Sequence, residues 1–240
     1  MTASTTTKER VTIVIPIRDE EASIGLVLQD LKRTIAEIQA YVFETIVVDD
    51  GSRDRGPDIA REHCATVIGN GHPHGKGAAL RRGFAAATGS IIVMMDGDYS
   101  HRAEDLGLFL KALTPDVNLV VGSRIFGGSD EYTPVRAFGN ILLTYVFGFL
   151  HGRYLSDALN GYKAFRREVV TRYGCSSNGF EIEIELLANA LRAGGRIVEV
   201  PSHERERAGG RSKSRIVRHG TRFLVRAIYE KTRRDRRDRN

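Results

Sequence analysis

Two aspartates, Asp96 and Asp98, follow the apolar run 91–93 and are separated only by Gly97. Such a run is typical of a buried strand, so both carboxylates are expected where that strand meets solvent. Like charges repel each other there unless a cation or a hydrogen-bond donor stabilises them. Carboxylate oxygens suit Mg²⁺ or Mn²⁺, which commonly join a protein carboxylate to substrate phosphates. Asp96 and Asp98 are therefore a predicted metal site, with an ordinary turn as the alternative.

A second acidic segment repeats this arrangement. The apolar residues 46–48 lead into Asp49, Asp50 and Gly51. Ligands of open α/β sheets bind at the carboxyl ends of strands, so the two acidic segments are expected to border one site. Gly97 would let a bulky ligand approach the backbone there, because it has no side chain.

The elements that carry these residues alternate between strand and helix, which predicts a mostly parallel sheet with helices on both faces. Residues 180–187 alternate like a strand, but apolar spacing as far as Leu191, followed by two glycines, favours a helix. The expected strands cover residues 11–15, 45–49, 65–68, 91–96, 118–121 and 196–200, and the expected helices cover 22–39, 57–63, 76–88, 105–113 and 180–191.

Composition bounds the class of protein. The 240 residues are 41% hydrophobic and 28% charged, which is typical of one globular domain. Two cysteines fit neither a disulfide framework nor a cysteine-rich metal site, which favours a reducing compartment. No apolar run is long enough to span a membrane, and residues 1–10 are polar, unlike a signal peptide. We therefore expect a cytoplasmic protein.

The charge of the chain is concentrated in its last segment. Residues 205–240 contain 14 Lys and Arg against 4 Asp and Glu. Apolar residues alternate with arginines there, which predicts a basic amphipathic helix lying in a membrane interface. Arg222, Arg226 and the run 233–239 would then contact membrane or nothing. In the alternative interpretation, the apolar face packs on the domain.

Other classes of protein fit less well. The segment Gly75-Lys76-Gly77 lacks the spacing and the Ser or Thr of a phosphate-binding P-loop. No glycine-rich dinucleotide motif follows the first strand, and no serine-hydrolase motif is present. The basic tail could bind nucleic acid, but it lacks interleaved aromatic residues, and that function leaves both acidic segments unexplained. No nucleic-acid partner is expected.

The remaining motifs form an ordered set: 16–20, 49–52, 75–79, 96–101, 122–124, 157–163, 199–201 and 207–213. This set resembles the inverting family-two glycosyltransferases, most closely the dolichol-phosphate (polyprenyl-phosphate) mannosyltransferases. The resemblance implies a GT-A fold, which is a single Rossmann-like, mostly parallel sheet flanked by helices. That domain would cover residues 11–213, between a polar tail (1–10) and a basic C-terminal helix (214–240).

The resemblance also implies an activity. The enzyme would move a hexose, with mannose from GDP-mannose favoured, to a polyprenyl or dolichyl phosphate with inversion, assisted by Mg²⁺ or Mn²⁺. It would lie peripherally at the cytoplasmic face of the membrane, where such an acceptor resides. A nucleotide-sugar-dependent transferase with a soluble hydroxyl acceptor is the alternative.

Roles for individual residues follow from the same resemblance. Asp96 and Asp98 would hold the metal, Arg124 and Arg136 the acceptor, and Asp98, Arg124 and Asp157 would serve catalysis. Glu183 is either a solvated helix residue or an acidic group near the acceptor. Nucleotide-sugar binding is assigned to Pro16, Arg18, Glu20, Val48, Asp50, Lys76, Asp96, Gly97, Asp98, Arg124, Arg207 and Lys213.

The two acceptors require different chemistry. A phosphate monoester has a second pKa of about 6, so near neutral pH a lipid phosphate is mostly a dianion. It attacks the anomeric carbon without a general base, and the protein positions the reactants and stabilises the leaving diphosphate. A hydroxyl acceptor would need a base, for which Asp157 and Glu183 are the candidates.

Overall fold

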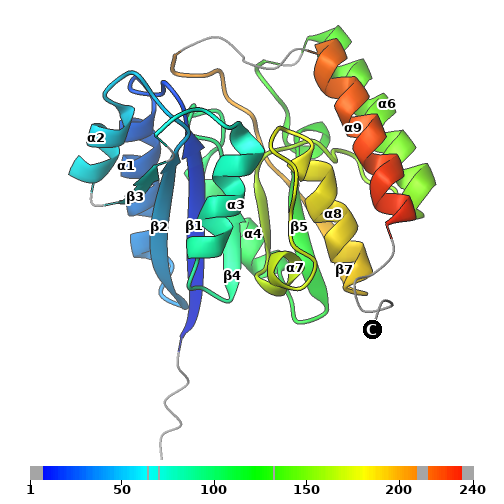
Figure 1. The fold of residues 1–240 in the computed structure, drawn as a ribbon. Helices are drawn as coiled ribbons and strands as arrows, with labels where there is room; N and C mark the ends of the chain where they lie inside the picture. Colours follow the sequence, from blue (N-terminus) through cyan, green and yellow to red (C-terminus); the bar gives the residue numbers. More distant parts are fainter. Residues whose placement is uncertain (1–7, 64, 70, 132, 210–215, 234–240) are drawn as a thin grey trace, which may run out of the picture.

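The structure is a computed structural model that describes residues 8–233 except 64, 70, 132 and 210–215. Its centre is a seven-stranded sheet in the order β3-β2-β1-β4-β6-β5-β7 (Figure 1). All neighbouring strands are parallel except β6, which runs antiparallel to β4 and β5. The strands are β1 (Glu9–Ile17), β2 (Tyr41–Asp49), β3 (Thr66–Gly69), β4 (Ile91–Met94), β5 (Val117–Ser123), β6 (Lys163–Arg166) and β7 (Arg196–Pro201).

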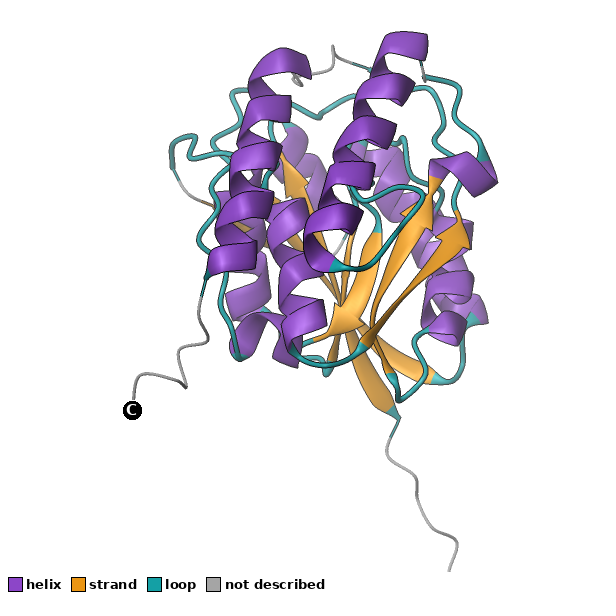
Figure 2. Cartoon of the chain, turned by 90° about the vertical axis from the view of Figure 1, so that its right-hand side faces the viewer, coloured by secondary structure: helices purple, strands orange, loops and turns teal. Residues whose placement is uncertain are grey.

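Helices cover both faces of this sheet. One face packs against α1 (Ile24–Glu37), α2 (Gly56–Glu62) and α4 (Leu106–Ala112), and the other against α3 (Lys76–Ala86) and α8 (Ile182–Arg192). The long helices α6 (Pro134–His151) and α9 (Ile216–Thr232) lie side by side at the edge of the molecule (Figure 2). The short elements are η1 (Ala103–Asp105), α5 (Arg124–Gly127) and α7 (Glu168–Thr171).

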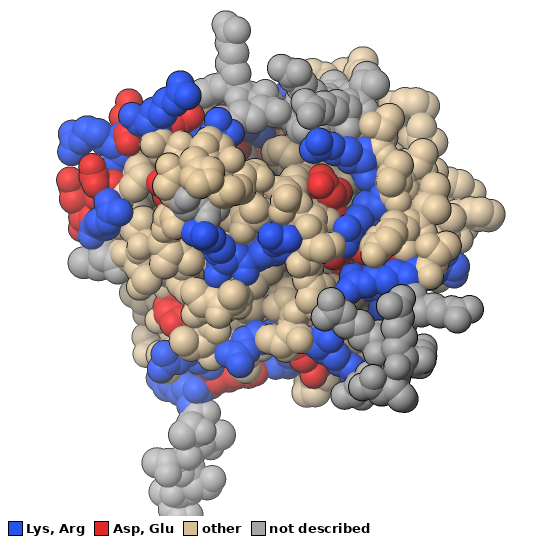
Figure 3. Space-filling model, viewed as in Figure 1, with Lys and Arg blue, Asp and Glu red and all other residues tan. Residues whose placement is uncertain are grey.

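The outer face of α6 is apolar and exposed. Val135, Phe138 and Phe149 keep 66%, 69% and 73% of their surface accessible. Figure 3 shows few charged side chains along the edge where Figure 1 draws α6. Among the described residues, no helix combines the length and the apolarity needed to cross a membrane.

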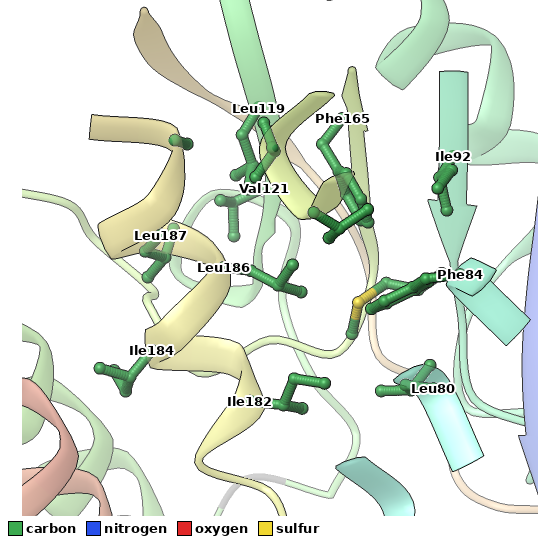
Figure 4. Close-up of a cluster of buried hydrophobic side chains, with 14 of the residues drawn as sticks. Leu80, Phe84, Ile92, Leu119, Val121, Phe165, Ile182, Ile184, Leu186 and Leu187 are labelled. Atoms are coloured by element: carbon green, nitrogen blue, oxygen red, sulfur yellow. The ribbon is translucent and has the colours of Figure 1, made fainter. Parts of the chain in front are cut away.

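A buried cluster fixes the two helices that carry site residues. Leu80 and Phe84 of α3 and Ile182 of α8 belong to the same buried cluster as Phe165 of the sheet (Figure 4). The rings of Phe84 and Phe165 meet edge to face, with their centroids 5.4 Å apart. Burying aromatic side chains in this geometry stabilises the contact beyond the area removed from water. Helices α3 and α8 are therefore packed against the sheet.

The predicted mostly parallel sheet with helices on both faces is confirmed, and residues 182–192 form the favoured helix. Strand β6 was missed because its four residues, Lys-Ala-Phe-Arg, show no strand alternation. It returns antiparallel between β4 and β5 and so places the loop before it, residues 157–162, beside the ends of both strands.

Helix α9 packs inward on its apolar side, through Phe223 and Ala227, as in the alternative interpretation of the tail. The prediction that Arg226 and Arg233 contact membrane or nothing is wrong. Arg226 pairs with Glu185 of α8 and lies 2.6 Å from Glu230 Oε1. Arg233 lies 3.6 Å from Glu185 and 3.5 Å from Glu230. These carboxylates are fully buried and need cations, which both arginines supply. Arg222 is exposed, and residues 234–239 lie outside the described part.

Candidate functional site

A cavity of about 430 Å³ lies beside the carboxyl ends of β4 and β5. Its charged residues come from strand ends, loops and helix starts, whereas its apolar residues come mainly from α6 and α9. The charged lining consists of Lys76, Asp96, Arg124, Glu131, Arg136, Glu183, Glu204 and Arg207. The apolar lining includes Leu142, Leu143, Leu159, Phe180, Phe223 and Leu224.

Asp98 is presented by a tight turn after β4. Its Oδ1 accepts hydrogen bonds from the Ser100 backbone N–H at 3.1 Å and the Ser100 hydroxyl at 2.6 Å. Its Oδ2 lies 3.1 Å from Arg207 Nη1. Only 6% of the residue is exposed, so these donors stabilise a carboxylate that is almost removed from water.

The same turn is pinned by Tyr99. This residue has a φ of 71°, a left-handed conformation that costs a non-glycine residue about 1–3 kcal/mol. Its hydroxyl donates to Asp30 of α1 at 2.8 Å, and the Arg205 guanidinium lies 4.0 Å from the ring centroid. These contacts offset the strain and fix the direction in which Asp98 points.

Asp96 begins a chain of alternating charges. Lys76 Nζ lies 2.6 Å from Asp96 Oδ1 and 3.2 Å from Glu183 Oε1, and Lys163 Nζ lies 2.6 Å from Glu183 Oε2. Burial alone would raise the pKa of Asp96, but Lys76, His101 and Arg207 together outweigh it and hold that pKa well below its usual range. Burial alone would lower the pKa of Lys76, but Asp96 and Glu183 raise it. The Asp96–Lys76 pair is therefore fully ionised.

Two glycines shape this region for different reasons. A Cβ at Gly161 would lie 2.8 Å from Asp96 Oδ2 and 3.0 Å from Lys76 Nζ, so only glycine leaves room for the ion pair. A Cβ at Gly97 would lie 2.7 Å from Ile17 Cγ2. Glycine at position 97 is therefore explained by its packing against strand β1, and the approach of a ligand to its backbone stays a prediction.

Arg124 is held by a fully buried partner. Its Nε and Nη2 lie 2.6 Å and 2.9 Å from the two oxygens of Asp157, and Asn140 of α6 donates to Asp157 Oδ1 at 2.8 Å. Arg124 Nη1 also lies 3.2 Å from Glu204. Burial raises the pKa of Asp157, but Arg124 and Asn140 lower it more, so the net shift is downward. Asp157 fixes the guanidinium and stays ionised.

The structure divides the predicted nucleotide-sugar residues into two groups. Lys76, Asp96, Arg124 and Arg207 line the cavity, together with the predicted acceptor residue Arg136. The others described, Pro16, Arg18, Glu20, Val48, Asp50, Gly97 and Asp98, are not among the cavity's lining residues. Lys213 lies outside the described residues.

Two residues of the second group have structural roles. Asp50 accepts hydrogen bonds from the backbone N–H groups of His74 and Gly75, at 2.8 Å and 2.9 Å. It thereby holds the loop that leads into α3. Val48 is fully buried in the core, between its sheet partners Pro16 and Ile68, so neither its side chain nor its backbone is open to a ligand.

No sequence pattern pointed to three of the site residues. Glu131, Asn140 and Glu204 are single polar residues of a loop, a helix and a strand end. Their partners, Arg207, Asp157 and Arg124, are distant in sequence, so only the fold reveals them. Glu183, for which the sequence left two interpretations open, is buried at the cavity.

Asp96 and Asp98 fit a divalent cation only in part. Their oxygens are the hard ligands that Mg²⁺ and Mn²⁺ prefer. The described residues contain no group of three or more His, Cys, Asp or Glu side chains placed to hold a metal ion. Such an ion would therefore need further oxygen ligands from a bound molecule, such as the phosphates of a substrate.

Comparison with known proteins agrees with this geometry. The family model described as Glycosyl transferase family 2 matches residues 12–174. A dolichyl-phosphate hexose transferase from Haloferax volcanii is 34% identical over 197 residues, covering 82% of this chain and 83% of that protein. A polyprenol monophosphomannose synthase from Mycolicibacterium smegmatis is 32% identical over 225 residues, covering 85% and 81%.

The fold also resembles solved structures. Glucosyl-3-phosphoglycerate synthase from Mycobacterium tuberculosis, in complex with Mn²⁺, UDP-glucose and phosphoglyceric acid, superposes with a TM-score of 0.74. The sequences are 23% identical, and the match covers 95% of this chain and 82% of that one. At this level of identity the likeness concerns the fold.

Proposed function

Because the chain belongs to glycosyl transferase family 2, we propose that it moves a hexose from a nucleotide sugar to a polyprenyl phosphate, with inversion. Mannose from GDP-mannose is the favoured donor, in line with the relative named as a polyprenol monophosphomannose synthase. Asp96 and Asp98 form the part of the site that binds the donor. Arg124, Arg136 and Arg207 bind phosphate.

The observation that carries this proposal is the two-sided character of the cavity. Arginines line it near the strand ends, and leucines and a phenylalanine line it along α6 and α9. A prenyl phosphate has the same division, because a charged head is joined to an apolar chain. Ligand pockets commonly combine an apolar lining with a few polar groups that fix orientation.

The alternative, a soluble hydroxyl acceptor, is disfavoured by the state of both candidate bases. The oxygens of Asp157 accept hydrogen bonds from Arg124 and Asn140. Glu183 lies between the ammonium groups of Lys76 and Lys163. A carboxylate held by cations is a poor acceptor for a hydroxyl proton. A phosphate dianion needs no base, so it is the acceptor that suits this site.

In the proposed reaction, a phosphate oxygen of the acceptor forms the bond to the anomeric carbon while the bond to the nucleoside diphosphate breaks. Arg124, fixed by Asp157, and Arg136 hold the attacking phosphate in line. Arg207, which lies between Asp98 on the donor side and Glu131 on the acceptor side, contacts both the attacking phosphate and the departing diphosphate as a forked donor. Mg²⁺ or Mn²⁺ at Asp96 and Asp98 would supply further stabilisation of the leaving charge.

The proposal is tested by incubating the full chain with GDP- and UDP-hexoses, Mg²⁺ or Mn²⁺, and a short, water-soluble prenyl phosphate. Transfer to the prenyl phosphate from one of these donors, and none to the corresponding prenyl alcohol, is the expected result. Transfer to the alcohol or to another hydroxyl compound, with none to the phosphate, would refute the proposed acceptor.

The pH profile provides a second measurement. We expect kcat/KM for the acceptor to fall below pH about 6, because the phosphate then takes up a proton and loses its second charge. Asp157 cannot cause this fall, since its lowered pKa keeps it ionised at still lower pH. A prenyl phosphonate, which has a higher second pKa, should move the fall to higher pH. An unmoved profile would mean that an enzyme group titrates instead.

Contact with the membrane is proposed to occur through α6 rather than through Arg226. Phe138 and Phe149 are exposed on this helix, and Leu142 of the same helix lines the cavity. An apolar helix face of this kind can enter the lipid headgroup region and bring the cavity to a membrane-bound acceptor. The contact would be peripheral, at the cytoplasmic face.

Phe138→Ser is therefore expected to reduce co-sedimentation with anionic vesicles severalfold and to leave transfer to the soluble prenyl phosphate unchanged. The removed ring would otherwise bury apolar surface in the interface. Leu108→Ser, on an exposed residue of α4 at the other face of the sheet, is the matched control. Equal vesicle binding by wild type and Phe138→Ser would contradict a membrane contact at this position.

A further inference from the structure

Glu131 lies in the loop between α5 and α6 and bridges two arginines. Its Oε2 is 3.2 Å from Arg207 Nε and 3.6 Å from Arg136 Nη1. Its Oε1 accepts a hydrogen bond of 3.2 Å from the backbone N–H of Arg207. All three residues line the cavity. One carboxylate thus sits between two guanidinium groups on the surface where a ligand would enter.

The bridge connects with the donor side of the site. Arg207 also lies 3.1 Å from Asp98 Oδ2, so the charges alternate from Asp98 through Arg207 and Glu131 to Arg136. Two arginines are thereby balanced by two carboxylates. An additional anion binds at this end of the cavity favourably only if one of the carboxylates moves away.

We propose that Glu131 occupies the place of the acceptor's phosphate, and that an acceptor binds by displacing Glu131 from Arg136 and Arg207. This inference rests on the proposed function and deepens it, because it makes Glu131 set how strongly an acceptor must bind the two arginines. A carboxylate and a phosphate offer guanidinium groups the same kind of oxygen ligand. They compete for the same two side chains.

The competition favours a doubly charged acceptor. Glu131 carries one negative charge, whereas a phosphate monoester carries nearly two at neutral pH and has three oxygens for the two arginines. The interaction of a phosphate with the arginines is therefore more favourable than the interaction that Glu131 gives up when it is displaced. A monoanion interacts with the arginines no more favourably than Glu131 does, and a neutral hydroxyl interacts with them less favourably.

Glu131 is also placed to move. Its side chain is 18% exposed and belongs to a surface loop, where rearrangement costs less than in a helix or strand. The loop keeps a separate anchor, because Ser129 donates a hydrogen bond of 2.6 Å to Glu204. The carboxylate can therefore turn into solvent while the loop stays attached.

The sign of one substitution separates this role from a purely structural one. If Glu131 only orients the arginines, its loss disorders them and weakens binding of a phosphate. If it competes with the phosphate, its loss strengthens binding. Glu131→Gln keeps the size of the side chain and removes its charge.

The experiment is calorimetric titration of the full chain, without donor, using a short prenyl phosphate and the corresponding prenyl sulfate, which is a monoanion. We expect Glu131→Gln to bind the phosphate about threefold to tenfold more tightly than wild type. The sulfate should gain by a similar factor, because either ligand must displace the same carboxylate. Asp130→Asn is the matched control. It removes a charge from the same loop, but Asp130 lies 3.1 Å from His203 rather than beside the two arginines.

Unchanged or weaker phosphate binding by Glu131→Gln would overturn the inference, and so would an equal gain in Asp130→Asn. These outcomes leave the proposed function standing, provided that wild type transfers hexose to the prenyl phosphate. Failure of wild type to use the prenyl phosphate would instead overturn the proposed acceptor, and the inference with it.

Discussion

Replacing Asp98 by asparagine is expected to reduce hexose transfer by about 10³-fold or more, the scale on which removing charge stabilisation slows a reaction. The amide oxygen still accepts the hydrogen bonds of Ser100, so the turn after β4 should keep its shape. The lost negative charge weakens both the predicted metal site and the hold on Arg207. The variant should unfold at nearly the same urea concentration as wild type.

Calorimetry with the donor separates a loss of chemistry from a loss of binding. Metal and donor should strengthen each other's binding in wild type, and Asp98→Asn should remove most of this coupling. Asp116→Asn is the control, because Asp116 also pairs with an arginine, Arg196 at 2.7 Å, but at an exposed position. Near-normal turnover in Asp98→Asn, or undiminished wild-type turnover in excess chelator, would disprove the metal role.

The sequence was informative where one short segment combines an element with its chemistry. Asp96 and Asp98 follow directly on an apolar strand, and Lys76 begins a helix, so their convergence at one sheet edge could be predicted. The ordered motifs also predicted the family, which the family match over residues 12–174 confirms.

The remaining features depend on contacts between distant segments. Glu204 meets Arg124 across 80 positions, and a side chain at Gly161 would meet the ion pair between Lys76 of α3 and Asp96 after β4. Strand β6 is too short for its alternation to be recognised, and its position is set by pairing on both sides. Local patterns carry no information about such partners.

The arginines of α9 illustrate the same limit. In sequence, Arg222 and Arg226 occupy equivalent places one turn apart on a basic helix, and both were expected to face membrane or nothing. Only the fold shows that Arg226 meets Glu185 and Glu230, which are buried at 0% and 2% exposure. The composition of this tail therefore does not distinguish an arginine that pairs with buried carboxylates from one that stays exposed.

Arg226→Met is accordingly expected to lower the free energy of unfolding by about 3–5 kcal/mol, the usual cost of breaking a buried ion pair from one side. Methionine fills much of the volume of the arginine stem but leaves Glu185 without its close cation, since Arg233 lies 3.6 Å away, whereas Glu230 keeps Arg192 at 2.5 Å. Arg222→Met removes the same group from an exposed position on the same helix and should change stability by about 0.5 kcal/mol or less.

Urea unfolding followed by circular dichroism measures both variants. Because α9 lines the cavity through Phe223 and Leu224, loosening this helix should also weaken binding of the prenyl phosphate in Arg226→Met. Equal stability of the two variants would contradict a structural role for Arg226. Loss of vesicle binding by both variants, with stability unchanged, would instead support the earlier expectation that α9 contacts the membrane. The two arginines would then act as equivalent surface charges.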